Sequence, residues 1–153
     1  MPNQNENRDL PISATDPTIQ EKLLSQWDLD WKRIEGGFRA PHPELRNKIG
    51  VFRAVLNDKV MYVGIGTEHS NGGLAKRIAD FSRSSDSARK SQSGRNIFEH
   101  RHNLEIDILV LAPIPGARAT AKLLKTAMIE RSRAAWNAPK HVIGRAQRGG
   151  QAA

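Results

Sequence analysis

Two apolar runs separated by Asn57-Asp58 constrain the fold of this chain more than any other feature. The runs cover residues 49–56 and 59–64, have the length of strands, and are rich in β-branched and aromatic residues. Asn and Asp tolerate the left-handed backbone that a two-residue hairpin turn requires. The sequence therefore predicts an antiparallel β-hairpin.

The rest of the chain predicts a small α/β domain around this hairpin. Residues 104–112 are apolar enough for a central third strand, and proline follows them. Helices are expected over 74–81, for a turn or two within 96–103, and over 117–135. The last helix places one apolar face toward the core, formed by Ala121, Leu124, Met128 and Ala135. This order of elements favours an α/β fold in which helices flank a three-stranded antiparallel sheet.

The N-terminal region predicts a helical extension of the domain. Residues 1–14 are polar and are expected to form a flexible leader. A helix is expected within 15–37, since Asp16-Pro17 is a typical helix start and Gly36-Gly37 a typical stop. Its apolar stripe would consist of Ile19, Leu23, Trp27, Trp31 and Ile34, with both tryptophans in the core. The domain proper would span 38–139, with loops at 38–48, 65–72 and 82–95 and a basic tail at 140–153.

The distribution of charge suggests a polyanionic partner. The chain has 153 residues and a net charge of +8, and residues 117–153 contain eight cations but one anion. Such a segment is typical of a nucleic-acid-binding surface, and the alternative is a solvated basic face. The chain has no cysteine, which excludes disulfides and cysteine-ligated zinc. We expect a cytoplasmic protein, since no secretory pattern or apolar membrane span is present.

Two further patterns have ordinary explanations. Gly64-Ile65-Gly66 with Gly72-Gly73 fits neither the dinucleotide fingerprint nor the P-loop spacing, so we interpret these glycines as loop geometry. His100-x-His102-Asn103 lacks nearby acids at metal-ligand spacing, so surface histidines are expected there.

A more specific pattern spans residues 49–139. Four short motifs follow one another in order: Gly50-Val51-Phe52, Tyr62-Val63-Gly64, Leu74-x-x-Arg77 and Trp136-Asn137. In this order the chain resembles the GIY-YIG nuclease superfamily, and residues 124–137 (LKTAMIERSRAAWN) resemble the ending of its restriction-type members. The resemblance implies a three-stranded antiparallel sheet flanked by helices, and Mg²⁺-dependent hydrolysis of a DNA phosphodiester. It assigns water activation to Tyr62, phosphate binding to Arg77 and support of the site to Asn137.

The chain departs from this family at positions that handle protons and metal. The tyrosine of the first tripeptide is Phe52, and Phe81 stands four residues after the arginine, where members often have His or Tyr. Lys125 stands twelve residues before Asn137, at the position of the metal-binding Glu. An ammonium group repels a hard cation, which prefers oxygen ligands. Substitute acids would be Glu130 or Glu99.

The same helix suggests phosphate binding without cleavage. At 100° per residue, four cations fall on one face and would form a ridge: Arg118, Lys122, Lys125 and Arg133. The polar loop adds Arg89, Lys90 and Arg95. Together with Arg77, these cations suit the DNA phosphate backbone.

Three functions follow from the sequence. The first is a DNA-binding protein on a GIY-YIG-like fold whose cleavage is impaired or lost. The second is an active endonuclease that binds Mg²⁺ through a substitute carboxylate. The third is a protein-interaction module that uses the tryptophan-bearing helix. The sequence leaves the target site, the choice of DNA over RNA and the oligomeric state open.

Overall fold

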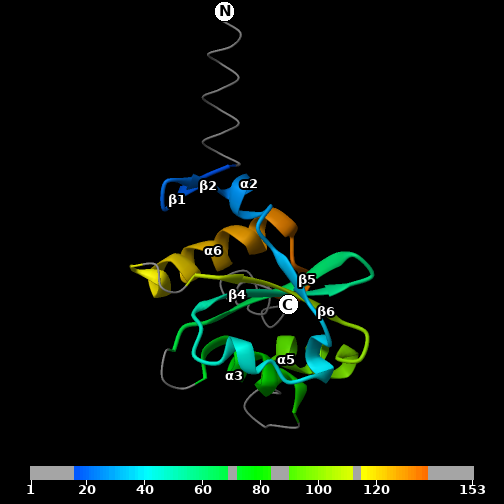
Figure 1. The fold of residues 1–153 in the computed structure, drawn as a ribbon. Coiled ribbons are helices and arrows are strands. Elements are labelled where there is room, and N and C mark those ends of the chain that lie inside the picture. The colour runs from blue at the N-terminus through cyan, green and yellow to red at the C-terminus, as the bar shows by residue number, and fades with distance from the viewer. Residues whose placement is uncertain (1–15, 69–71, 84–89, 112–114, 138–153) are drawn as a thin grey trace, which may run out of the picture.

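The computed structural model describes residues 16–68, 72–83, 90–111 and 115–137, which form a mixed α/β fold (Figure 1). The main sheet is antiparallel with strand order β3-β6-β4-β5. Its strands are β3 (Lys32–Ile34), β4 (Gly50–Leu56), β5 (Lys59–Gly66) and β6 (Glu105–Val110). The helices are α2 (Leu24–Trp27), α3 (Gly73–Ser82), α5 (Gln92–His100) and α6 (Ala117–Ser132), with short 3-10 turns at η1 (Gly37–Arg39), η2 (Pro43–Leu45) and η3 (Ala135–Asn137). The expected leader and basic tail lie outside the described residues.

The hairpin prediction is confirmed by β4 and β5. Asn57 and Asp58 have φ values of 51° and 65°, the left-handed conformation that a tight hairpin turn needs. The register shifts at Ala54/Val55, so that Ala54 pairs with Tyr62 and Val55 with Val60. Because this bulge inserts one residue, Val60 packs on one side of the sheet and Tyr62 on the other. The bulge thus sets which face Tyr62 occupies.

Helices cover both faces of the sheet, α6 on one face and α3 and α5 on the other (Figure 1), and each face has its own apolar cluster. On one face α6 packs against Val51, Val63 and Leu109 through buried residues that include Ala121, Leu124 and Met128. On the other face α3 and α5 cover Phe52, Tyr62 and the isoleucines of β6. The helix predictions for 74–81 and 117–135 are largely confirmed, but α6 ends at Ser132 and Ala135 lies exposed beyond it.

The predicted N-terminal helix within 15–37 is wrong. This segment instead forms the hairpin β1 (Thr18–Ile19) and β2 (Lys22–Leu23), the single turn α2, and the strand β3. Gln20 and Glu21 adopt left-handed backbone conformations, and Asp16 binds the Ser25 backbone N–H at 2.7 Å instead of capping a helix. The sheet accordingly has four strands where three were expected.

Long-range ion pairs explain why the N-terminal segment joins the sheet. Buried Asp107 of β6 accepts hydrogen bonds from Arg33 of β3 at 2.5 Å and from Arg53 of β4 at 2.8 Å. Asp28 extends this ion-pair network to α6. Its carboxylate oxygens lie 3.5 Å from the Arg53 guanidinium and accept a hydrogen bond from the Arg131 guanidinium at 3.0 Å. These contacts span up to 103 residues of sequence, so the local pattern could not reveal them.

Two loop predictions also need correction. Residues 92–95 belong to α5, whose first turn is capped by the Ser91 hydroxyl. The predicted strand 59–64 extends to Gly66 in β5, so Gly66 does not belong to the loop expected at 65–72. A Cβ at Gly64 would lie 2.6 Å from the ring of Phe52, and one at Gly66 would lie 2.6 Å from the Leu74 nitrogen. These glycines therefore allow close packing on β5.

None of the helices that the structure describes combines the length and the apolar character needed to cross a bilayer.

Candidate functional site

Tyr62 of β5 and Arg77 of α3 meet at one side of the sheet. Tyr62 is 7 % exposed, whereas Arg77 is exposed and its guanidinium carbon lies 5.5 Å from the Phe81 ring centroid. The Arg77 guanidinium lies close enough to the Tyr62 hydroxyl to act on its pKa. The glycine at position 66 lets the start of α3 approach β5, which places Arg77 beside the strand. The structure therefore brings together the two residues to which the sequence assigned the central roles.

Two phenylalanine rings pack against Tyr62. The Tyr62 ring lies 6.0 Å from Phe52 and 5.5 Å from Phe81, measured between centroids. Both phenylalanines are buried, and Phe52 is fully so. Gly50 and Gly64 occupy the neighbouring strands, where Gly64 pairs with Phe52. The positions that supply proton-transfer groups in the similar family thus contribute packing here.

The protonation of Tyr62 follows from this burial. Burial raises the pKa of the Tyr62 hydroxyl above its ordinary value, and the charge and hydrogen bond of Arg77 only partly oppose this. The phenol is therefore neutral at pH 7 and can donate its proton in a hydrogen bond. Together with the nearby Arg77 guanidinium, the Tyr62 hydroxyl provides hydrogen-bond donors that suit a phosphate oxygen.

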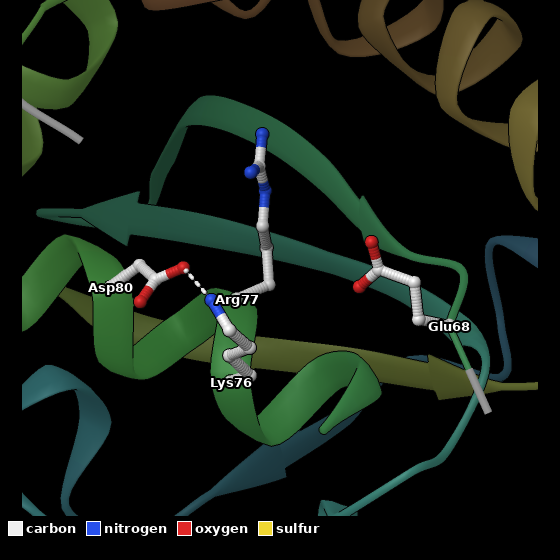
Figure 2. Close-up of a pocket in the computed structure, with 4 residues that line it drawn as sticks. All are labelled: Glu68, Lys76, Arg77 and Asp80. Atoms are coloured by element: carbon white, nitrogen blue, oxygen red, sulfur yellow. Dashed lines mark hydrogen bonds and ion pairs between the residues drawn. The ribbon is translucent and has the colours of Figure 1, made fainter. Parts of the chain in front are cut away.

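A pocket of about 270 Å³ opens next to Arg77 (Figure 2). Its lining residues are Glu68, from the segment after β5, and Lys76, Arg77 and Asp80 of α3. Lys76 forms an ion pair with Asp80 at 2.9 Å, and Arg83 binds the same carboxylate at 2.6 Å. Burial alone would raise the pKa of Asp80, but the hydrogen bonds from Lys76 and Arg83 outweigh it and hold the pKa below its usual value.

Glu68 was not identified from the sequence. Its side chain is exposed and forms no hydrogen bond or ion pair with any other described residue. In Figure 2 its carboxylate faces the space beside Arg77. The only sequence signal was its position just past the end of the predicted second strand, and nothing local indicated that this segment borders α3.

Asn137 holds the outer edge of β5. Its side-chain oxygen accepts from the Val63 N–H at 2.6 Å, and its side-chain nitrogen donates to the Val63 carbonyl at 2.9 Å. Val63 directly follows Tyr62 in the strand. The preceding residue, Trp136, makes two further contacts. Its carbonyl accepts a hydrogen bond from the Ser93 hydroxyl at 2.5 Å, and the centroid of its ring lies 5.2 Å from that of His100. Asn137 therefore supports the strand that carries Tyr62.

Lys125 lies away from this arrangement, on the helix that covers the opposite face of the sheet. Of the predicted cationic ridge, Arg118 and Lys122 are exposed and Lys125 is half-buried. Arg133 leaves the helical register, because it follows the last helical residue with a φ of 54°. The four cations therefore do not form one continuous helical face.

The other cations predicted to bind DNA also lie on separate parts of the structure. Lys90 and Arg95 are exposed at the start of α5, where the Arg95 guanidinium binds Gln92 at 2.9 Å. Arg89 lies outside the described residues. Arg118 is nearest to the pocket, because its guanidinium donates to the Thr67 carbonyl at 3.1 Å and Thr67 immediately precedes Glu68.

The residues at the family's metal position do not fit a divalent cation. Lys125 is a cation. Of the substitutes considered from the sequence, Glu130 lies on α6 with Lys125 and Glu99 lies on α5, whereas Tyr62 and Arg77 lie on β5 and α3. Within the described residues, no group of three or more His, Asp or Glu side chains could hold a metal. His100 was expected at the surface but is half-buried: its ring is tilted against that of Trp136, and its Nδ1 hydrogen-bonds with the Asn96 carbonyl at 2.9 Å.

Comparisons with models of protein families, with curated proteins and with solved structures give no match for this chain.

Proposed function

We propose that the protein binds the phosphate backbone of DNA, on a GIY-YIG-like fold in which phosphodiester cleavage is impaired or lost. The observation that supports this most is the pairing of Tyr62 and Arg77. A neutral hydroxyl and a guanidinium share one site, and the guanidinium has no acidic partner among the described residues. Such a pair can donate several hydrogen bonds to one phosphate group.

A second set of cations supports the same function. The Arg118 guanidinium reaches the segment that borders the pocket, and Lys122 is exposed one turn further along α6. The Arg77 pocket and the start of α6 therefore flank the same short segment, residues 67–68. A phosphate backbone that crosses this end of β5 would meet cations on both sides.

The expected loss of cleavage rests on the groups that are missing. Phe52 and Phe81 carry no hydroxyl, Lys125 supplies no oxygen ligand, and the Tyr62 phenol keeps its proton at neutral pH. Cleavage needs both a deprotonated water and stabilisation of charge at the phosphate. One observation favours the alternative of an active endonuclease, since the Glu68 carboxylate lies beside Arg77 and forms no ion pair with another described residue.

The third function, a protein-interaction module, required the tryptophan-bearing helix as its surface. The tryptophan-bearing helix does not form, and Trp27 is buried with its indole nitrogen bonded to the Ile19 carbonyl at 3.0 Å. A protein partner is therefore not proposed.

The test measures binding to a labelled DNA duplex as a function of salt, for the native protein and three variants. Arg77→Ala and Lys122→Glu should each lower affinity about tenfold, the usual scale for a contact with a charged group. Lys59→Glu is the matched control, because it makes the same charge change at the far end of β5. It should change affinity much less.

About three phosphate contacts predict a slope of roughly −3 when the logarithm of the affinity is plotted against the logarithm of the salt concentration. Three outcomes would contradict the proposal. Affinity that does not change with salt would exclude a phosphate contact. An equal loss in Lys59→Glu would mean that net charge alone decides binding. A large fall in the thermal midpoint of Arg77→Ala would show that Arg77 is structural.

A further inference from the structure

A second pocket, of about 240 Å³, lies on the side of the sheet that α6 covers. Its lining comes from residues 28–31, from β4 and β5, and from the C-terminal part of α6. Residues 28–31 border it because the helix expected for 15–37 does not form and this segment leads into β3 instead. The pocket is separate from the site of Tyr62, which packs in the apolar cluster on the other face of the sheet.

The buried part of the lining is apolar. Val63 and Met128 are almost completely buried, and Val60 and Trp31 are half-buried. An apolar cavity of about 150 Å³ is large enough to hold benzene, so this pocket has room for an aromatic ring and a short polar group. A methionine sulfur and an indole ring both make favourable contacts with an aromatic ring. The apolar lining therefore suits a ligand with an aromatic body.

The polar part of the lining is an arginine pair organised by one carboxylate. Asp28 accepts a hydrogen bond from the Trp31 indole at 2.8 Å and another from the Arg131 Nε at 3.0 Å. A terminal nitrogen of Arg53 lies 3.5 Å from the same carboxylate. The Arg53 guanidinium also lies over the Trp31 ring, 4.4 Å from its centroid. These contacts hold both guanidiniums at the pocket.

Both arginines keep hydrogen-bond donors that the described residues do not use. Arg131 contacts Asp28 through Nε, and its two terminal nitrogens form no hydrogen bond with a described residue. Arg53 spends its Nε on Asp107, which is shared with Arg33, and one of its terminal nitrogens has no described partner. Among the side chains that line the pocket, two guanidiniums and one carboxylate leave one net positive charge. The pocket therefore offers guanidinium donors to a ligand with a single negative charge.

We propose that this pocket binds a small aromatic carboxylate. The aromatic ring packs against Val60, Val63 and Met128, and the carboxylate accepts hydrogen bonds from the terminal nitrogens of Arg131 and Arg53. The planar guanidinium matches the two oxygens of a carboxylate, and its charge strengthens each hydrogen bond. This binding does not require DNA, so it adds a second ligand class to the protein.

The experiment is isothermal titration calorimetry of the full chain with phenylacetate, in the absence of DNA. A ligand of this size should bind with a dissociation constant of about 0.1–1 mM. Two comparison ligands separate the parts of the site. Phenylacetamide has nearly the same shape but no charge, and acetate has the charge but no ring. Each should bind at least about tenfold more weakly than phenylacetate.

The variant Arg131→Met tests the guanidinium and keeps an apolar stem of similar length. It should weaken phenylacetate about tenfold and leave the affinity for phenylacetamide nearly unchanged, which also shows that the pocket remains intact. Arg39→Met is the matched control, because Arg39 is an exposed arginine on η1, which packs against α3 on the other side of the sheet. It should bind phenylacetate like the native protein.

A second variant tests the apolar part of the pocket. Val60→Phe places a ring in the space that the ligand would occupy, so it should abolish binding of phenylacetate while its thermal midpoint shows that the protein is folded. Native affinity in folded Val60→Phe would refute the assigned pocket.

Three further results would overturn the proposal. Equal affinity for phenylacetate and phenylacetamide would show that the guanidiniums do not hold the carboxylate. An equal loss in Arg39→Met and Arg131→Met would mean that net charge alone attracts the acid. The absence of any binding of phenylacetate at several millimolar would exclude the site, and it would leave the proposed binding of DNA standing.

Discussion

Replacing Asn137 by alanine should destabilise the whole domain, although Asn137 lies in a short turn at the end of the described chain. The substitution removes the carbonyl oxygen and the amino group that bind the backbone of Val63 at 2.6 and 2.9 Å. Val63 is fully buried and sits on the outer strand of the sheet. Its N–H and C=O therefore lose their partners in a place that water reaches poorly.

The size of the effect follows from the two lost hydrogen bonds. A buried backbone group left without a partner costs about 1–3 kcal/mol. Two such groups, with partial access of water after the turn relaxes, give a total of about 2–4 kcal/mol. For a domain of this size that loss lowers the thermal midpoint by about 4–16 °C.

Urea denaturation of the native protein and two variants checks this prediction. Asn103→Ala is the matched control, because Asn103 is exposed and its side chain forms no hydrogen bond with a described residue. It should change the free energy of unfolding by less than about 0.5 kcal/mol. If Asn137→Ala is as stable as Asn103→Ala, the two bonds to Val63 do not support the strand and the reasoning is wrong.

Three other predictions follow from buried contacts. Asp107→Asn should cost about 2–4 kcal/mol in urea denaturation, since it leaves Arg33 without its buried partner and Arg33 is itself partly solvated; a loss below 1 kcal/mol, an ordinary surface effect, would refute this. Gly64→Ala should lower stability by about 1–3 kcal/mol, because its methyl group would lie 2.6 Å from the Phe52 ring; an unchanged thermal midpoint would show that the ring moves freely. Tyr62 is the sole tyrosine, so its alkaline absorbance titration should show a midpoint above the ordinary pKa of about 10. Since the unfolded chain then loses its proton first, the stability advantage of the native protein over Tyr62→Phe should shrink as pH rises above about 10, and a constant difference would contradict it.

Sequence reasoning succeeded where neighbouring residues decide the structure. The turn at Asn57-Asp58 joins strands that are adjacent in the chain, and both residues tolerate the conformation that the turn needs. It failed for residues 15–37, where an apolar repeat of three to four residues favoured a helix. There β3 pairs with β6, and Asp107 binds Arg33 across 74 residues, so tertiary contacts override the local pattern.

In the candidate site, too, the sequence could predict some residues and not others. The proximity of Tyr62 and Arg77 could be predicted because their motifs are short and ordered, and Arg77 lies near enough to act on the pKa of Tyr62; the roles of both residues stay predictions. Glu68 could not be predicted, because its place in the pocket depends on how the end of β5 approaches α3. The ridge on α6 was only partly predictable, since the helix ends before Arg133.

The pairing of β3 with β6 has a consequence for synthesis of the protein on the ribosome. Arg33 and its partner Asp107 are 74 residues apart, and β6 is the inner neighbour of β3 in the sheet. At about 5–20 residues per second, roughly 4–15 s pass between the synthesis of these two residues. During that interval the apolar side chains of the N-terminal segment have no sheet to cover them. The segment 16–34 is therefore open to chaperones and to misassociation during synthesis, and β3 docks only after the hairpin of β4 and β5 and then β6 have been made.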